Sequence, residues 1–207
     1  NNYDTVIWLA ALVGDGACAV DPKETISINQ KPLEWLCDNF KGRIIFTSTC
    51  SVYGAQPDQL ISENSEVNPL DSYGQSKFDS ERVILQAYDY PTILRLGTLF
   101  GASHRMRFDL AINLFIAQAM NSEEITVFGG DQWRPFLHVD DAAEAFTFAV
   151  ENKIEGIYNV VWKNITINQI AKEVKEKLNP SDFIGYDQIE TTHIGVAMAI
   201  SSGRTDA

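Results

Sequence analysis

Cysteine, basic residues and long apolar runs are scarce in this sequence of 207 residues. Its three cysteines, Cys18, Cys37 and Cys50, include no C-x-x-C pair, so neither a disulfide framework nor a zinc clamp is indicated. Lys and Arg total 16 against 28 Asp and Glu, and the net charge of -12 disfavours general binding to nucleic acid or an anionic membrane. No apolar run reaches the roughly 18 residues of a spanning helix. The first residues also lack the features of an export signal, so we expect a cytoplasmic protein.

Hydrophobic residues make up 45% of the chain and charged residues 21%, the composition of one ordinary globular domain or slightly more. The sequence begins without Met and almost at once enters an apolar stretch, residues 5–13. We therefore expect the natural protein to have further residues ahead of this stretch.

Short β-branched runs alternate with longer amphipathic segments in the first half of the chain. We expect strands at 5–13, 43–48 and 91–100 and helices at 22–40 and 72–87. Pro32 should kink or split the first helix, and Ser72 with Gln75 fits a capping box at the start of the second. Parallel strands need helical crossovers, so this alternation predicts an α/β fold with a doubly wound parallel sheet.

The pattern changes after residue 101, and we expect a smaller α/β lobe there. Its expected elements are helices at 108–120 and 140–150, strands at 125–128 and 157–161, and a helix from the capping box Thr166–Gln169 to about residue 178. The sequence therefore divides into residues 1–101 and 102–207.

A glycine pattern after the opening strand imitates a dinucleotide-binding fingerprint, with Gly14, Gly16 and Ala19 followed by Glu34. A true fingerprint places the acidic residue after a second strand, whereas Glu34 lies in a helical stretch. We interpret residues 14–19 as a plain loop.

Tyr73 and Lys77 are four residues apart, so both side chains share one face of the expected helix. A nearby ammonium lowers the pKa of a phenol and makes it a proton carrier; the alternative is an exposed helix pair. The strand before this helix ends in hydroxyls, including Thr49. Ligands collect at the carboxyl ends of such strands, where a hydroxyl can bond the substrate oxygen on which Tyr73 acts.

These features belong to a longer set of motifs in fixed order. The set comprises Ile7–Ala11, Ser48–Gly54, Tyr73-Gly-x-Ser-Lys77, Leu94-Arg95 with Phe100-Gly101, and Arg134–Asp141. Together they resemble the extended short-chain dehydrogenase/reductase family of NAD-dependent nucleotide-sugar epimerases and dehydratases. The resemblance covers nearly the whole chain.

For the first half, the resemblance implies that Tyr73 is the catalytic acid/base. Lys77 would lower its pKa and hold the nicotinamide ribose, and Thr49 would take the place of the catalytic Ser/Thr. Ala10 and Ala11 would line the adenosine side of the cofactor. Residues 1–101 would then be a partial dinucleotide-binding domain for NAD, with NADP left open because the deciding residue follows a strand that this sequence lacks.

For the second half, the resemblance implies a lobe, residues 102–207, that mainly binds a nucleotide-diphosphate sugar. Arg134 would grip the diphosphate, which its planar guanidinium suits, and Asn113 would contact the substrate. Structural roles stay open for Asn113, Arg134 and the two alanines. The helices around residues 24–40 and 72–89 would form a homodimer.

The chain also departs from the family. About 60 residues with the glycine-rich turn are not in this sequence, which should leave the opening strand with an unpaired apolar edge and weak NAD binding. Thr98 stands where the family has Asn, and no clear substrate-binding arginine occurs around residues 195–202. Cys50 and Ser51 replace the Asp-Glu pair of a 4,6-dehydratase, which disfavours dehydration.

The expected reaction is transient oxidation at C4 of an NDP-hexose, and an epimerase is favoured. A 4-dehydrogenase or 4-ketoreductase is the alternative, and a non-catalytic nucleotide-binding sensor is a weaker one. Cys50 and His104 come from segments that carry an additional acid/base pair in some family members. A buried inert thiol and a surface imidazole are the simpler interpretation. His138 is interpreted as structural, and no catalytic metal is indicated.

Overall fold

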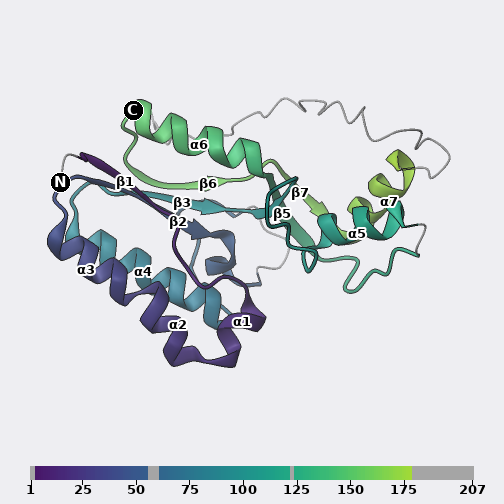
Figure 1. The fold of residues 1–207 in the computed structure, drawn as a ribbon, viewed down its shortest axis with the longest axis horizontal. Coiled ribbons are helices and arrows are strands. Elements are labelled where there is room, and N and C mark those ends of the chain that lie inside the picture. The colour runs from purple at the N-terminus through teal and green to yellow at the C-terminus, as the bar shows by residue number, and fades with distance from the viewer. Residues whose placement is uncertain (1–2, 56–60, 122–123, 179–207) are drawn as a thin grey trace. The chain divides into compact units, whose positions relative to one another are not determined.

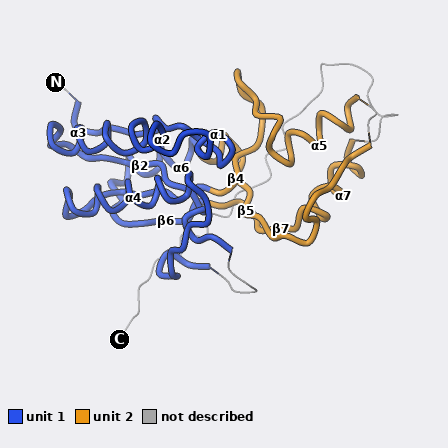
Figure 2. The backbone as a smooth tube through the Cα atoms, turned by 90° about the horizontal axis from the view of Figure 1, so that it is seen from below, with its two compact units in different colours: residues 1–96, 143–160, 200–207 blue, residues 97–142, 161–199 orange. Residues whose placement is uncertain are grey.

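The computed structural model describes residues 3–55, 61–121 and 124–178, which fall into two units (Figure 2). The first unit contains residues 3–96 and 143–160, and the second contains residues 97–142 and 161–178. The elements of the first unit are β1 (Thr5–Trp8), α1 (Asp15–Val20), α2 (Pro22–Asn29), α3 (Lys31–Asn39), β2 (Arg43–Thr49), the 3-10 turn η1 (Cys50–Tyr53), α4 (Ser72–Ala87), β3 (Thr92–Leu96), most of α6 (Val139–Glu151) and β6 (Gly156–Val160).

The first unit is built on a parallel sheet with strand order β1-β2-β3-β6. Helices α2 to α4 lie on one face of this sheet and α6 on the other (Figure 1). Every crossover between neighbouring strands passes through helical segments, as parallel pairing requires. The prediction of an α/β fold with a helix-covered parallel sheet is confirmed.

Apolar side chains of α3 and α4 meet those of β2 and β3 in the core of this unit. The buried members are Leu33, Cys37, Ile44, Phe46, Ile84 and Ile93. Burial of one such aliphatic side chain contributes about 1.5–3 kcal/mol to folding. Alternate residues of β2 and β3 therefore face α4, which fixes the register of the two strands.

Several expected boundaries in this unit need correction. The opening strand ends at Trp8, and most of residues 14–19, interpreted as loop, belong to α1. The helix expected at 22–40 is split at Gln30, and Pro32 lies in the first turn of α3, where its missing N–H is harmless.

Helix α4 has the predicted bounds but a different cap. Asp71, in an extended conformation, accepts a hydrogen bond from the Gly74 N–H through Oδ1 at 2.6 Å. Ser72 is already helical, so the predicted capping box at Ser72 is wrong. Asp71 takes the cap position because its carboxylate reaches the free N–H groups of the first turn.

The strand expected at 91–100 divides at Gly97 into β3 and β4 (Thr98–Phe100), which belong to different sheets. A Cβ atom on Gly97 would lie 3.0 Å from the carbonyl oxygen of Pro135. The missing side chain thus permits the close approach of two backbones where the chain enters the second unit.

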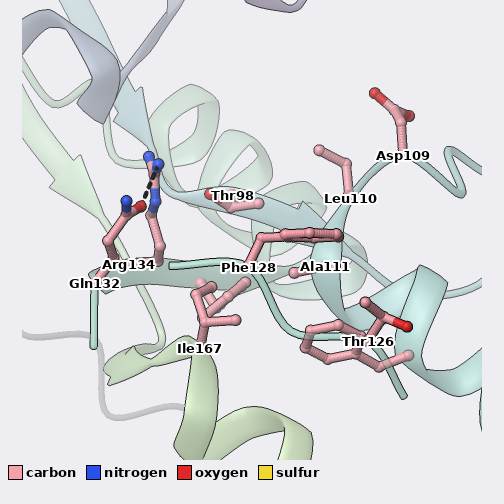
Figure 3. Close-up of a pocket in the computed structure, with 11 residues that line it drawn as sticks. Thr98, Asp109, Leu110, Ala111, Thr126, Phe128, Gln132, Arg134 and Ile167 are labelled. Atoms are coloured by element: carbon pink, nitrogen blue, oxygen red, sulfur yellow. Dashed lines mark hydrogen bonds between the residues drawn. The ribbon is translucent and has the colours of Figure 1, made fainter. Parts of the chain in front are cut away.

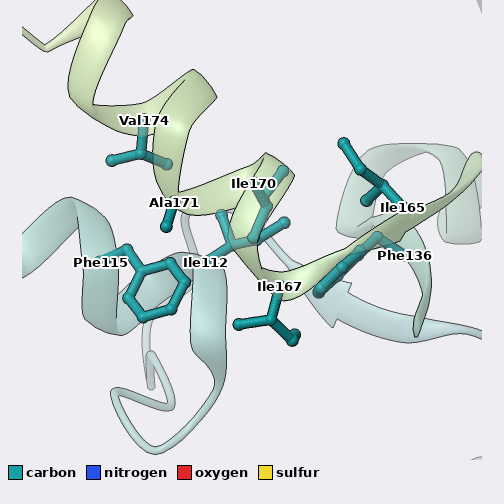
Figure 4. Packing of buried hydrophobic residues seen from close by; sticks show 8 residues of the cluster. All are labelled: Ile112, Phe115, Phe136, Ile165, Ile167, Ile170, Ala171 and Val174. Atoms are coloured by element: carbon teal, nitrogen blue, oxygen red, sulfur yellow. The ribbon is translucent and has the colours of Figure 1, made fainter. Parts of the chain in front are cut away.

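The second unit has a three-stranded sheet with order β4-β5-β7, and the helices α5 and α7. The bounds are α5 Ala111–Met120, β5 Trp133–His138, β7 Lys163–Thr166 and α7 Ile167–Lys177. β4 pairs with β5 in parallel and β5 with β7 antiparallel. The buried core, shown in Figure 4, comprises Ile112, Phe115, Phe136, Ile165, Ile167, Ile170, Ala171 and Val174.

Sequence patterns were less informative for this unit. Residues 125–128 form no strand, so that prediction is wrong, although Ile125 and Val127 pack against the core. β5 and β7 were not predicted, because Pro135 lies inside β5 and cannot donate to a ladder, and because β7 has only four residues. The capping box at Thr166 is confirmed.

Within the described ranges, β1 is hydrogen-bonded to β2 alone, which leaves its other edge without a strand partner there. The same ranges include no helix with the length and apolar character needed to cross a membrane.

Candidate active site

The carboxyl end of β2 supplies the first hydroxyl group of the site. The buried apolar residues of β2, Ile44, Ile45 and Phe46, are followed by three hydroxyl residues, and the last of these, Thr49, is 9% exposed. The chain then turns into η1, and Thr49 Oγ1 accepts a hydrogen bond from Ser51 N at 3.2 Å. Thr49 is therefore held at the strand end by the turn that it caps.

The first turn of α4 contacts this 3-10 turn directly. A Cβ atom on Gly74 would lie 3.0 Å from the carbonyl oxygen of Ser51, so the absence of a side chain allows the contact. Tyr73, the neighbour of Gly74, is half-buried. The structure thus brings the segments of Thr49 and Tyr73 together.

Lys77 lies one helical turn after Tyr73 and is 3% exposed. Its Nζ atom is 4.3 Å from the centre of the Phe46 ring, a cation–π contact. Burial lowers the pKa of Lys77 to about 8, and the carboxylate of Glu81 opposes this shift. Within the described ranges, Nζ has no hydrogen-bond or ion-pair partner, so the ammonium keeps its donors for another group.

A buried network of hydrogen bonds centres on Glu81, one helical turn after Lys77 on α4. Arg95 donates from Nε to Glu81 Oε1 at 2.9 Å and from Nη2 to Glu81 Oε2 at 2.6 Å. Ser48 Oγ also donates to Glu81, and Arg95 Nη1 donates to Tyr53 Oη at 2.8 Å. Glu81 was not singled out from the sequence, although it continues the four-residue spacing of Tyr73 and Lys77.

Asn29 is a second residue that the sequence analysis missed. It is 2% exposed in α2 and donates from Nδ2 to Ser76 Oγ at 2.9 Å and to the Leu12 carbonyl at 3.0 Å. Its Oδ1 accepts from Leu12 N at 2.6 Å. One amide therefore ties the loop after β1 to the residue that precedes Lys77. Asn29 can be recognised only from its burial, which depends on the fold and not on a local sequence pattern.

Ala10 and Ala11 lie in that loop, at the carboxyl end of β1, where α/β sheets bind ligands. Ala10 is exposed and Ala11 half-buried. Their small side chains leave the backbone accessible beside the strand end.

Cys50 follows Thr49, but its thiol is occupied within the protein. Its Sγ atom donates to the carbonyl oxygen of Arg95 at 3.4 Å, and burial raises its pKa to about 12. A thiol with this pKa stays protonated at neutral pH and is a poor acid/base at that pH. The geometry favours the inert interpretation of Cys50. His104 is exposed, in the loop before α5, as expected for a surface imidazole.

The second unit contains a pocket of about 390 Å³ (Figure 3). Its lining comprises Thr98, Asp109, Leu110, Ala111, Phe115, Thr126, Phe128, Gln132, Arg134, Phe136 and Ile167. Arg134 projects from β5, and its Nη2 donates to Gln132 Oε1 at 3.1 Å. An exposed guanidinium and an exposed Phe128 ring thus share one hollow with apolar walls. This combination suits an anionic ligand that carries a flat ring.

Asn113 is 5% exposed and does not line this pocket. Its Nδ2 donates to the Arg107 carbonyl at 3.1 Å, and its Oδ1 accepts from Gly101 N at 3.3 Å. The amide therefore holds the loop ahead of α5.

His138 also has a local structural contact, because its Nδ1 accepts a hydrogen bond from Asp140 N at 3.3 Å in the first turn of α6.

The sequence model of the NAD dependent epimerase/dehydratase family matches residues 1–161. The chain belongs to this family. The match confirms the resemblance inferred from the motifs around Thr49, Tyr73 and Lys77.

Three similar proteins illustrate the range of the family. An N-acetyl-alpha-D-glucosaminyl-diphospho-ditrans,octacis-undecaprenol 4-epimerase of Escherichia coli O157:H7 is 28% identical, over 86% of this chain and 55% of that protein. A dTDP-4-dehydro-6-deoxyglucose reductase of Escherichia coli is 28% identical, over 97% of this chain and 67% of that protein. The crystal structure of UDP-glucuronic acid 4-epimerase from Bacillus cereus with UDP-glucuronic acid and NAD is 28% identical, with a TM-score of 0.75, and the match covers 84% of this chain and 59% of that one.

The chain spans only part of its relatives. It covers 38% to 55% of the lengths of three curated epimerases that it matches.

Proposed function

We propose that the protein is an NAD-dependent nucleotide-sugar epimerase that acts by transient oxidation at C4 of an NDP-hexose. The observation that carries this proposal is the state of Lys77. It is a buried ammonium whose donors no described residue occupies, and it lies one helical turn from Tyr73 and near the hydroxyl-rich end of β2. Family membership and the epimerases among the relatives support it.

In the proposed mechanism, Tyr73 Oη removes the proton from the C4 hydroxyl and later returns it. The positive charge of Lys77 favours the phenolate form of Tyr73, and its free N–H groups suit hydroxyls of the cofactor ribose. Thr49 Oγ1 bonds the same C4 oxygen and orients it toward the phenol. NAD, when bound, supplies the hydride acceptor for this chemistry.

The first unit fits the cofactor on two counts. No described residue occupies the donors of its buried ammonium, and two small side chains, Ala10 and Ala11, lie in the loop at the carboxyl end of β1. We propose residues 1–101 as the dinucleotide-binding part, to whose sheet β6 adds a strand and on which α6 packs.

For the second unit we propose binding of the nucleotide diphosphate. Arg134 is exposed in the pocket and presents a planar fork of donors, which suits phosphate oxygens. Phe128, 84% exposed, offers a face on which a base can stack. Asn113 is proposed to position the loop of residues 101–107.

A 4-ketoreductase is the second candidate function, because the reductase relative matches 97% of this chain. Both candidates use the same proton carrier. They differ in whether the keto sugar leaves the site.

Product analysis of the full-length natural protein tests the proposal. UDP-glucose with catalytic NAD should give UDP-galactose without net NADH, whereas net NADH or consumption of a 4-keto sugar indicates the second candidate.

Tyr73→Phe should lower turnover by about 10²–10⁴-fold while ligand binding persists. Tyr90→Phe, at a tyrosine that is 72% exposed in the same unit, is the matched control and should keep full activity. Unchanged turnover in Tyr73→Phe would refute the mechanism.

We also propose a homodimer formed through α3 and α4, where Trp35 is 65% and Leu85 46% exposed. Sedimentation velocity should give a dimer that Trp35→Lys dissociates. A monomeric wild-type protein would contradict this assignment.

A further inference from the structure

The ion pair between Glu81 and Arg95 is buried to an unusual degree. Glu81 is 0% and Arg95 3% exposed, and two parallel N–H···O bonds join them. Two such charges are expensive to remove from water, and hydrophobic replacements of a buried pair are often equally stable. Stability alone is therefore a weak reason for this pair to lie under the site.

The position of Glu81 suggests a different role. It follows Lys77 by four residues on α4, so the two side chains share one face of the helix. Arg95 and Ser48 hold the carboxylate with hydrogen bonds, which prevents it from turning toward solvent. Glu81 therefore presents a fixed negative charge to a lysine whose pKa burial lowers.

We propose that Glu81 is a positioning residue for Lys77, held by Arg95 and Ser48 so that its carboxylate keeps the buried lysine in the ammonium form. The strength of the ion pair then sets the pH above which the lysine loses its charge. This inference deepens the proposed function, since it concerns the lysine assigned to that chemistry.

The thiol and phenol groups around α4 stay neutral near neutral pH. On the elements that contact α4 they are Cys18 of α1, Cys37 of α3, and Cys50 and Tyr53 of η1, and burial raises the pKa of each. From β2, Phe46 and Ser48 face the helix, and from α2 Asn29 does so. The charged residues of α1, α2 and α3 are exposed or, in Glu34, half-buried. Arg43, at the first position of β2, is half-buried and donates to the carbonyl oxygens of Ala149 and Ile154. Glu81 and Arg95 are therefore the charged groups that act on Lys77 from inside this unit.

The test is a direct titration of Lys77 in the full chain, which needs neither cofactor nor substrate. Lysines labelled with ¹³C at Cε are followed by NMR from pH 6 to 11, and loss of one signal in Lys77→Arg assigns Lys77. The wild-type midpoint should lie near pH 8. Glu81→Gln should move it down by roughly one pH unit or more, because the carboxylate is lost while Arg95 stays charged.

Two further variants separate charge from structure. Glu81→Gln combined with Arg95→Met removes both charges, avoids an unpaired buried ion and should fold; its midpoint should lie below wild type but above the single variant. Ser48→Ala removes one hydrogen bond to Glu81 without changing charge, so it should lower Tm and leave the midpoint in place. A midpoint that stays at the wild-type value in whichever of the two Glu81→Gln proteins folds overturns the proposal.

The result is independent of the proposed function. If the titration shifts as expected but the full-length protein turns over no nucleotide sugar, the positioning role stands and the enzymatic assignment fails. If turnover is found and the midpoint does not move, only the role of Glu81 fails.

Discussion

Arg95 Nη2 and Glu81 Oε2 in the first unit are 2.6 Å apart, with side chains 3% and 0% exposed. Arg107 Nη2 and Asp109 Oδ2 in the second unit are 2.5 Å apart, with side chains 37% and 62% exposed. The two bonds are similar in length, but their surroundings differ. The first pair is closed to solvent, whereas the second pair and the Arg134 guanidinium of the pocket face solvent. The comparison teaches that two ion pairs of similar length can lie in opposite surroundings, one closed to solvent and one open to it.

The largest effect on stability should come from breaking the buried pair. Glu81→Gln should lower the free energy of unfolding by about 3–5 kcal/mol, because it leaves the Arg95 guanidinium buried without a counter-charge. Urea denaturation measures the change. The double variant with Arg95→Met should lie within about 1 kcal/mol of wild type. Equal losses in both proteins would show that packing, not charge, accounts for the effect.

Substitution of Arg134 tests whether the solvent-facing pocket of the second unit binds a diphosphate. Arg134→Gln should weaken the binding of UDP roughly tenfold to a hundredfold, the value of a charge-assisted hydrogen bond of about 1.5–3 kcal/mol. Isothermal titration calorimetry gives the Kd. Arg105→Gln, at another exposed arginine of the same unit, is the control and should bind UDP as wild type does. Equal affinity in Arg134→Gln would separate the pocket from diphosphate binding.

Lys77 provides a pH test of burial. Its lowered folded pKa means that between about pH 8 and its usual value of 10.5 the unfolded chain binds more protons than the folded one. The buried charge thus destabilises the fold fully below pH 8, and this penalty disappears as the pH rises toward 10.5.

Lys77→Met should accordingly be more stable than wild type at pH 7, by roughly 1–3 kcal/mol. The gap between the two proteins should narrow at pH 10. Paired urea titrations at the two pH values measure it. An equal difference in unfolding free energy at pH 7 and pH 10 would contradict the burial of a charged Lys77.

The smallest effect should come from the exposed pair. Asp109→Asn should change the free energy of unfolding by less than about 0.5 kcal/mol, because solvent screens charges at this degree of exposure. Chemical denaturation at low and high salt measures it. A loss comparable to that of Glu81→Gln would remove the contrast between the two units.

Part of this architecture was readable from the sequence because it depends on local patterns. The bounds of α4, the buried strand β2 and the spacing of Tyr73 and Lys77 follow from periodicities that one segment displays alone. The capping box at Thr166 is equally local. Tertiary pairing overrode local pattern elsewhere: Gly97 divides one apparent strand between two sheets, and β5 forms around Pro135 because β4 and β7 flank it.

The candidate site shows the same division. The sequence alone determined which residues can carry proton chemistry, because Tyr73 and Lys77 lie on one helical face whatever that helix contacts. Only the tertiary structure decided that Lys77 is buried on Phe46, that Glu81 is bonded to Arg95 and that Asn29 links a distant loop to α4. Burial and long-range hydrogen bonds depend on segments far apart in the chain, and no local periodicity records which of them will meet.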